Sequence, residues 1–200
     1  MAQLNSLLTP GKLLVAPGIY DGISARVADE VGFEVLYMTG YGAVGSHLGL
    51  PDAGLASYTE MVGRVDVIAN SISVPLIADG DTGYGALLNI ERTVRGYERA
   101  GAAAIQIEDQ EYPKKCGHTP GKRVIDIADW GQKIKVAAET RNSGDFLIVA
   151  RTDARAVNGL DDALRRAEVA AEAGADILFV EAPESEAEMQ AICTNTDRPQ

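Results

Sequence analysis

The chain has 200 residues, of which 46% are hydrophobic and 24% are charged, and its formal net charge at pH 7 is −11. This composition is typical of a single globular domain, spanning residues 1–200, that can bury a sizeable core. The strong negative charge repels phosphate backbones, so nucleic acid is not an expected partner. No apolar run approaches the ~20 residues that cross a bilayer, and the N-terminus does not resemble a signal peptide, so no membrane partner is expected either.

The two cysteines, Cys116 and Cys193, form neither a disulfide framework nor a paired zinc motif. They therefore predict a reduced, cytoplasmic compartment. Cys193 falls within a helical pattern and is expected to be buried in the core.

A short apolar run followed by a longer helical stretch recurs six times, with no break in composition. Such runs are typical of strands buried on both faces. The predicted strands are 13–16, 35–38, 76–78, 104–107, 146–150 and 177–180. The predicted helices are 22–31, 57–71, 89–100, 126–141, 160–173 and 184–195. Three of these repeats pass from helix to strand through Gly32, Gly101 or Gly174, and glycine there predicts a left-handed C-terminal cap.

Strict alternation of strands and helices predicts an α/β fold with a parallel sheet. A doubly wound open sheet is one possibility, but the first strand is not followed by its usual Gly-rich dinucleotide turn. A (β/α)8 TIM-type barrel is favoured because polar, functional-looking residues follow nearly every predicted strand. Six units do not complete eight, so we expect a barrel domain that is truncated at its C-terminal end.

The sharpest motif is Asp79-Gly80-Asp81-Thr82-Gly83-Tyr84-Gly85, directly after a predicted strand. The next predicted strand ends in Glu108 and Asp109, at what should be the neighbouring position on the same rim. Acidic groups that converge in this way repel one another unless a cation lies between them, and carboxylate oxygens suit Mg²⁺. The alternative is an acidic loop in which these residues cap helices and form salt bridges.

A long loop between the fourth strand and the fourth helix carries Lys114, Cys116 and His118. Long ordered loops often act as active-site lids, and positive neighbours favour the thiolate form of a cysteine. The motif therefore predicts a mobile loop whose thiol takes part in proton transfer. The alternative is an exposed basic loop in which the cysteine is incidental.

Two more strands end in polar residues, Arg151 and Glu181, and a guanidinium is well suited to a bidentate contact with a carboxylate. After the second strand, the backbone N–H groups of Thr39-Gly40-Tyr41 are candidates for cradling a substrate carboxylate. Arg151 and Glu181 could equally be structural, and the glycine-rich segment a plain flexible loop.

These motifs occur in a characteristic order and together resemble the isocitrate lyase/phosphoenolpyruvate mutase superfamily, in its short-chain branch. The resemblance covers essentially the whole chain. The segments that carry it are Tyr37-Met38-Thr39-Gly40, Leu48-Gly49-Leu50-Pro51-Asp52, 79–85, Glu108-Asp109-Gln110, Lys114-Lys115-Cys116-Gly117-His118 and Ala150-Arg151-Thr152-Asp153.

The resemblance implies a (β/α)8 barrel that assembles as a homotetramer, binds Mg²⁺ (with Mn²⁺ as a possible substitute) and acts on a small carboxylate. The metal-site positions it implies are Asp52, Asp79, Asp81 and Glu108. The substrate-binding positions are Thr39, Gly40, Tyr41, Gly117, His118, Arg151 and Glu181.

The same resemblance gives catalytic positions to Tyr37, as base for the substrate hydroxyl, and to Cys116, as the acid that protonates the departing carbanion. Lys114, His118 and Arg151 complete that set. The implied reaction is Mg-dependent cleavage of a C–C bond in a 2-hydroxy di- or tricarboxylate such as 2-methylisocitrate or dimethylmalate. A phosphonomutase, an oxaloacetate hydrolase or decarboxylase, and an inactive truncated assembly partner are the alternatives.

Overall fold

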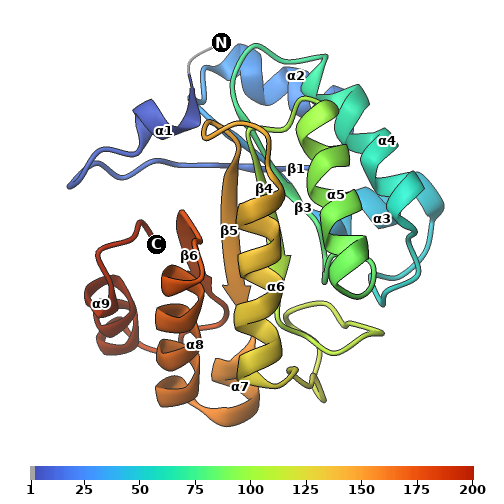
Figure 1. Ribbon diagram of the computed structural model, residues 1–200. Coiled ribbons are helices and arrows are strands. Elements are labelled where there is room, and N and C mark those ends of the chain that lie inside the picture. Colours follow the sequence, from blue (N-terminus) through green and yellow to red (C-terminus); the bar gives the residue numbers. More distant parts are fainter. Residues whose placement is uncertain (1–2) are drawn as a thin grey trace.

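The computed structural model describes residues 3–200, which fold around one parallel sheet (Figure 1). Each strand pairs with its neighbour in sequence, in the order β1-β2-β3-β4-β5-β6. The strands are β1 (Gly18–Ile19), β2 (Leu36–Met38), β3 (Leu76–Asp79), β4 (Ala104–Glu108), β5 (Leu147–Thr152) and β6 (Ile177–Val180). This sequential order is that of a barrel, because a doubly wound sheet reverses its strand order at a switch point.

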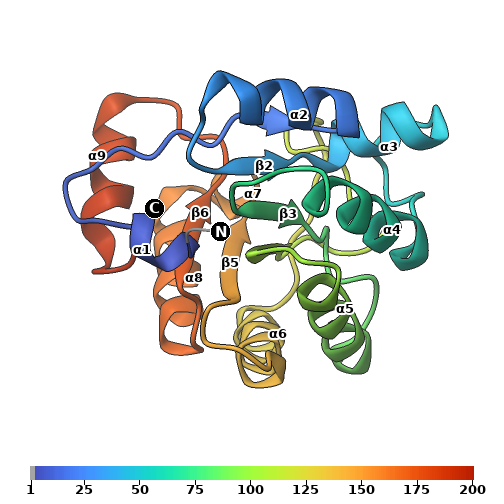
Figure 2. The same ribbon diagram turned by 90° about the horizontal axis from the view of Figure 1, so that it is seen from above.

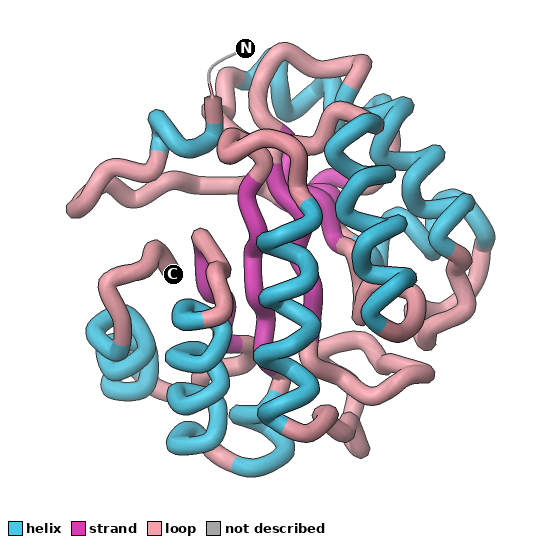
Figure 3. Tube along the Cα trace, in the orientation of Figure 1, coloured by secondary structure: helices cyan, strands magenta, loops and turns pink. Residues whose placement is uncertain are grey.

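Long helices such as α2, α4, α5, α6 and α8 lie along the outer side of the curved sheet, whereas α1 lies at one end of its interior (Figures 2 and 3). The helices are α1 (Leu4–Leu7), α2 (Gly22–Val31), α3 (Gly40–Leu48), α4 (Tyr58–Ala69), α5 (Leu87–Arg99), α6 (Ile127–Thr140), α7 (Ala154–Asn158), α8 (Leu160–Glu172) and α9 (Glu186–Asn195). Within residues 3–200, none of these helices is long and apolar enough to cross a bilayer.

Local sequence explains where several helices begin. The Asp21 side chain accepts a hydrogen bond from the backbone N–H of Ser24, which begins α2. Ser57 and Glu60 form a reciprocal capping box at the start of α4. Such caps satisfy N–H groups that have no partner inside the helix, so they define the first turn.

Five of the six predicted strands are confirmed within one or two residues, but the first is wrong. Residues 13–16 form no strand, and Leu13 is 86% exposed. Pairing begins only afterwards, where the Tyr37 N–H donates to the Pro17 carbonyl. This apolar run lines the open space between the two edge strands of the sheet and pairs with neither of them.

Two other expectations require correction. The segment after β2, for which a plain flexible glycine loop was the alternative to a carboxylate cradle, folds into the helix α3. Cys193 lies in α9 but is exposed rather than buried. The helical pattern there was right, but the direction of the side chain depends on which face of α9 packs inward.

Alternation along the strands divides the apolar core into two parts. One set of side chains faces the helices, where Met38, Ile105 and Ile107 pack with Tyr97 and Trp130. The other set faces the inside of the sheet and, near the N-terminal ends of the strands, forms a second apolar cluster. That cluster consists of Leu4, Val35, Ala104, Leu147, Val149 and Ile177. Leu4 of α1 thus plugs one end of the interior, and polar residues occupy the other end.

The predicted glycine caps are confirmed, because Gly32, Gly101 and Gly174 all have positive φ. At Gly174 φ is +107°, and an added Cβ would lie 2.9 Å from the Ala138 Cβ. The chain can therefore turn from α8 into β6 at this point only with a residue that tolerates positive φ and has no side chain.

We predict that Gly174→Ala lowers the free energy of unfolding by about 1–3 kcal/mol, the usual cost of a strained backbone conformation. The matched control is Gly63→Ala in α4, where an added Cβ meets no other described atom within 4 Å. That change should raise stability by about 0.5–1 kcal/mol, because glycine is unfavourable inside a helix. Urea denaturation of both variants measures the difference, and equal effects would contradict the prediction.

Candidate active site

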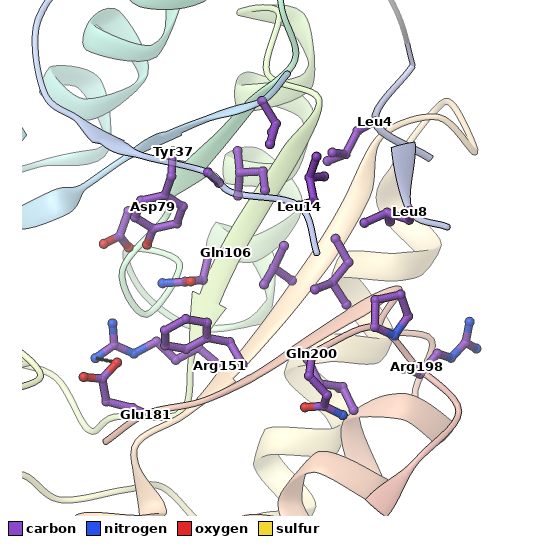
Figure 4. A pocket seen from close by; sticks show the side chains of 18 of the residues that line it. Leu4, Leu8, Leu14, Tyr37, Asp79, Gln106, Arg151, Glu181, Arg198 and Gln200 are labelled. Carbon is purple, nitrogen blue, oxygen red and sulfur yellow. Dashed lines mark ion pairs between the residues drawn. The ribbon is translucent and has the colours of Figure 1, made fainter. Parts of the chain in front are cut away.

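The C-terminal ends of the strands open into a cavity of about 1340 Å³. Figure 4 shows its polar end, where Tyr37, Asp79, Gln106, Arg151 and Glu181 lie close together. Leu4, Leu8 and Leu14 line the opposite end. This division follows from strand alternation, because inward-facing residues are apolar early in each strand and polar where the strand ends.

Four buried carboxylates surround the Lys114 ammonium group. Asp79 ends β3, Asp81 lies two residues later, Glu108 ends β4, and Asp52 lies between α3 and α4. The Lys114 Nζ forms ion pairs with Asp52 Oδ1 and, at 2.7 Å, with Asp81 Oδ1. Because the side chain of Lys114 is only 3% exposed, this cluster is almost fully withdrawn from water.

Backbone N–H groups fix the orientation of Asp79. Its Oδ1 accepts from the N–H of Asp81 at 3.0 Å, and its Oδ2 accepts from the N–H of Gly40 at 3.1 Å. A Cβ at Gly40 would lie 2.7 Å from that Oδ2, so the close approach of α3 to Asp79 requires glycine. The aspartate is thereby held rigidly at the rim of the cavity.

The expected backbone cradle is partly occupied by these internal contacts. The N–H of Thr39 donates to the Ile19 carbonyl, and that of Gly40 is bound to Asp79. Tyr41 is exposed, lines the cavity and is the second residue of α3. Its N–H therefore has no acceptor within the helix and points out from the helix N-terminus.

Burial and mutual repulsion raise the pKa values of Asp81 and Glu108 within the cluster. Burial raises the pKa of Asp81 to about 6, with Lys114 opposing and Asp79 adding to the shift. Burial also raises the pKa of Glu108 well above its usual value, against the opposing charges of Arg151 and Lys114. For Lys114 burial lowers the pKa, but the carboxylates outweigh it, so that the pKa rises above its ordinary value. One lysine therefore does not neutralise this group of acids.

Tyr37 of β2 faces the same group of charges. Burial and then the neighbouring charge of Asp79 raise the pKa of Tyr37 well above 10, although Arg151 opposes the shift. The phenol is therefore neutral under ordinary conditions and can donate a hydrogen bond.

The residues at the carboxylate cluster fit a divalent cation by charge and by donor type. Within the described residues, Asp52 Oδ1, Asp81 Oδ1 and Glu108 Oε1 are buried without a hydrogen-bond partner, although the first two lie in ion-pair range of Lys114. No three His, Cys, Asp or Glu side chains in residues 3–200 converge as a complete ligand set. Mg²⁺ commonly takes one or two carboxylates and keeps several waters, so these two observations are compatible.

Arg151 of β5 lies at the far side of the cluster. Its Nε is 3.5 Å from Glu108 Oε2, and its Nη2 is 3.3 Å from Glu181 Oε2. Asp153 holds the guanidinium through two hydrogen bonds, from Nε at 3.0 Å and from Nη2 at 3.1 Å. The arginine is therefore fixed in orientation with its edge toward the cavity.

The long loop expected to cover the site is placed above it. The Cys116 thiol is half-buried and lines the cavity, and the Cys116 N–H donates to the Asp52 carbonyl at 3.1 Å. Gly117 lies so close to Arg151 that an added Cβ would be 2.4 Å from the guanidinium Nη2. His118 also lines the cavity, but its side chain is exposed. The loop thus brings the thiol to the same cavity as the charged cluster.

Sequence reasoning did not single out two buried polar residues of the site. Gln106 is 1% exposed, faces the cavity, and its Nε2 has no hydrogen-bond partner among the described residues. The sequence does contain a signal for Gln106, because this glutamine interrupts an apolar strand two residues before Glu108. Asp153 was part of the family motif, but its contact with Arg151 depends on the folded geometry.

Asp109, by contrast, is structural, in keeping with the alternative reading of that motif. It accepts hydrogen bonds from the Thr152 hydroxyl at 2.6 Å and from the Asp153 N–H at 2.9 Å. It also pairs with Arg166 of α8 at 3.2 Å. Its fully buried carboxylate joins β4, β5 and α8 behind the cavity, whereas its neighbour Glu108 points into it.

We predict that Asp109→Asn destabilises the fold by about 1–3 kcal/mol, because it removes one of the two carboxylates that pair with the buried Arg166 guanidinium and leaves only Asp162. The control is Glu111→Gln, two residues later, which removes an exposed ion pair with Arg123. That change should cost less than about 0.5 kcal/mol. Urea denaturation distinguishes the two, and a loss at Asp109 as small as that at Glu111 would show that the buried pair is not needed.

Residues 4–200 match the family model described as phosphoenolpyruvate phosphomutase. A relative at 51% identity over 191 residues, covering 96% of this chain and 66% of its own length, is 2,3-dimethylmalate lyase of Eubacterium barkeri. A solved structure of oxaloacetate acetylhydrolase with the inhibitor 3,3-difluorooxalacetate is 40% identical, with a TM-score of 0.93. It covers 98% of this chain and 67% of that one.

A third match is the structure of phosphonopyruvate hydrolase with oxalate and Mg²⁺, at 32% identity and a TM-score of 0.84. The alignment covers 95% of this chain and 66% of that protein. The chain thus spans about two-thirds of the length of the proteins that it matches. On these grounds the chain belongs to the phosphoenolpyruvate mutase/isocitrate lyase superfamily.

Proposed function

We propose that this protein is a divalent-cation-dependent C–C lyase that cleaves a 2-hydroxy di- or tricarboxylate of the 2,3-dimethylmalate or 2-methylisocitrate class. The observation that carries the proposal is the cluster of four buried carboxylates beside Arg151, with the Cys116 thiol on the loop above. The relative at 51% identity, a 2,3-dimethylmalate lyase, supports cleavage of a C–C bond.

The cation of this proposal is Mg²⁺ or Mn²⁺, held by Asp79, Asp81, Glu108 and Asp52, in part through water. When bound there, it would supply positive charge that polarises a substrate oxygen and balances the carboxylates. The uncompensated charge of the cluster supports this assignment, as does the Mg²⁺ in the phosphonopyruvate hydrolase structure.

Substrate binding would fall to the positive groups facing the cavity. Arg151 is oriented by Asp153 and can contact a carboxylate through its remaining N–H groups. The N–H of Tyr41 at the start of α3 suits a second carboxylate, because a helix N-terminus attracts anions. Thr39, Gly40, Gly117, His118 and Glu181 complete the proposed binding residues.

Cleavage would proceed as a retro-aldol step. Tyr37, as its phenolate, takes the substrate hydroxyl proton, the C–O bond becomes a carbonyl, the adjacent C–C bond breaks, and its electron pair passes to a carbanion delocalised into a carboxylate. Arg151 stabilises that developing negative charge, with the Lys114 ammonium nearby. The Cys116 thiol then delivers a proton to the carbanion carbon, and the loop excludes water.

Tyr37 requires a more specific assignment than the family resemblance implies. Its raised pKa means that the neutral phenol faces the cavity. A neutral phenol donates a hydrogen bond to a substrate oxygen, whereas acting as a base for the hydroxyl first requires loss of that proton. We therefore propose that Tyr37 donates a hydrogen bond to the substrate oxygen before cleavage and takes the hydroxyl proton as its phenolate, which a cation at the carboxylate cluster would favour.

A second candidate is hydrolysis of oxaloacetate, favoured by the TM-score of 0.93 to oxaloacetate acetylhydrolase. Proton and phosphorus NMR of the chain with Mg²⁺ and a substrate panel distinguishes the candidates. The panel contains 2,3-dimethylmalate, 2-methylisocitrate, oxaloacetate and phosphonopyruvate. C–C cleavage of a 2-hydroxy acid supports the proposal, whereas turnover of oxaloacetate or phosphonopyruvate alone overturns it. Assembly as a homo-oligomer stays a prediction, for which sedimentation is the measurement.

We predict that Cys116→Ser slows C–C cleavage by about 10²–10⁴-fold, the usual contribution of a positioned general acid. A serine hydroxyl of the same shape should leave the affinity for oxalate with Mg²⁺ nearly unchanged. Cys193→Ser is the control, since Cys193 is the other cysteine of the chain and lies in α9. If Cys116→Ser matches that control in rate, the thiol does not deliver the proton.

We further predict that Asp79→Asn weakens Mg²⁺-dependent stabilisation, because it removes one negative charge from the cluster while keeping the side-chain shape. Ligand that binds only the folded state raises the melting temperature, so a thermal-shift titration with Mg²⁺ and oxalate measures the effect. The control is Asp161→Asn, at an exposed position in the first turn of α8. An Asp79 variant that titrates like wild type would contradict the proposed metal site.

A further inference from the structure

The loop between β4 and α6 is closed at its base. Gln110 and Val124 form an antiparallel bridge. The Glu111 N–H donates to the Arg123 carbonyl at 2.9 Å, and the Ile125 N–H donates to the Asp109 carbonyl at 2.9 Å. These contacts fix the two ends of the loop, so that movement of its tip, residues 114–121, is a separate question from folding of its base.

Lys122 connects the tip of this loop to the sheet. It lies at the base, yet its side chain is only 3% exposed. Its ammonium donates to the Gly117 carbonyl in the tip and, at 2.7 Å, to Asp153 Oδ1 behind β5. A buried ammonium is costly unless it is paired and hydrogen-bonded, so these contacts stabilise the seated position of the tip.

The same carboxylate that receives Lys122 also orients Arg151. Asp153 Oδ1 accepts from Lys122 Nζ and from Arg151 Nη2, and Asp153 Oδ2 accepts from Arg151 Nε. Asp153 itself is fully buried and anchored by its N–H to Asp109. Gly117, which Lys122 holds by its carbonyl, packs against the Arg151 guanidinium, since an added Cβ there would lie 2.4 Å from Nη2. Loop tip, lysine, aspartate and arginine thus form one continuous set of contacts.

We propose that Lys122 is a positioning residue that links the seated conformation of the 114–121 tip to the orientation of Arg151 through Asp153. While the tip is seated, Lys122 bridges it to Asp153. When the tip moves away, the Lys122 ammonium loses its contact with the Gly117 carbonyl. The position of Lys122, and with it that of the Asp153 carboxylate, is then less restricted. The part of this inference that concerns substrate rests on the proposed function, because it takes Arg151 as the carboxylate-binding group. The link itself depends only on this chain's contacts.

Trypsin cleavage between Lys115 and Cys116 measures release of the tip without any substrate. Lys115 is exposed, and its ammonium contacts only carbonyl groups of its own loop, those of Pro120 and Gly121. In Lys122→Met, cleavage there should be about tenfold to a hundredfold faster, the change expected from losing charge-assisted hydrogen bonds. Lys122→Arg should retain most of the protection, because it keeps the charge and the donors.

The matched control is Arg123→Met. It also removes a basic residue and a tryptic site from the base of the loop, but its side chain is 74% exposed and pairs only with Glu111. Cleavage after Lys115 in this variant should proceed at the wild-type rate. Equal rates in wild type, Lys122→Met and Arg123→Met would overturn the proposal.

Gly117→Ala provides an independent variant if Lys122→Met fails to fold. The added Cβ would lie 2.4 Å from Arg151 Nη2. Because Asp153 and Glu181 hold that guanidinium, the tip should shift although Lys122 is intact. Its tryptic site should become as accessible as in Lys122→Met, at an unchanged melting temperature. A protected site in this variant would contradict the contact between tip and arginine.

The link to Arg151 is measured separately by ligand affinity and kinetics. Lys122→Met should weaken oxalate binding in the presence of Mg²⁺ by about tenfold, and Lys122→Arg should restore it. Faster cleavage at Lys115 with unchanged oxalate affinity would show that Lys122 holds the tip without affecting Arg151. That result would overturn the proposed link from Lys122 to Arg151. If the substrate panel shows no lyase turnover while these two readouts change together, the proposed function fails and the positioning role of Lys122 stands.

Discussion

The concentration of negative charge at one end of the sheet is the constraint on which the rest of the site depends. Asp52, Asp79, Asp81 and Glu108 are buried around a single lysine, Lys114. Removing ions from water costs several kcal/mol each unless their charge is balanced. The raised pKa values of Asp81 and Glu108 express that cost directly. We therefore attribute the cluster to the proposed cation site rather than to a stabilising role.

The parallel sheet can hold this charge because its two ends differ. Inward-facing apolar residues early in β4, β5 and β6 fill one end of the interior, which Leu4 of α1 closes. Polar residues lie at the opposite end of the strands, where pairing in register sets neighbours side by side, as Glu108 faces Arg151. The apolar residues that pack the core and the polar residues of the site therefore lie only a few residues apart along a strand. In this way a barrel-type sheet combines a packed core with a reactive rim.

One loop supplies several of the groups that complete the rim. Lys114 enters the carboxylate cluster, Cys116 borders the cavity, Gly117 packs on Arg151 and Lys122 reaches Asp153. Seating this loop therefore changes the charge balance, the access of water and the position of the thiol together. Asp109 and Arg166 stand behind the loop and keep β4, β5 and α8 fixed against it. The hydrogen-bonded base of the loop, where the Glu111 N–H donates to the Arg123 carbonyl, joins this rigid part to the tip that would move.

The sequence by itself determined most of the secondary structure and the identity of the rim. Periodicity placed five of six strands, glycines marked the helix ends, and carboxylates directly after buried strands had to meet at one edge, because parallel strands end on the same side. The motifs also sufficed for the family. Local pattern failed where pairing decides the outcome: residues 13–16 have strand composition but no partner, and the glycines after β2 form α3 once Gly40 packs on Asp79.

Only the tertiary structure decided what each polar residue contacts. Lys114 reads as part of an exposed basic loop but is buried among acids. Asp109 is structural although it adjoins Glu108, and Lys122 meets Asp153 across 31 residues of sequence. The same geometry sets the raised pKa of Tyr37, which comes from burial and the charges around it. Such contacts join residues remote in sequence, and their energies depend on distance and burial, which exist only once the chain has folded.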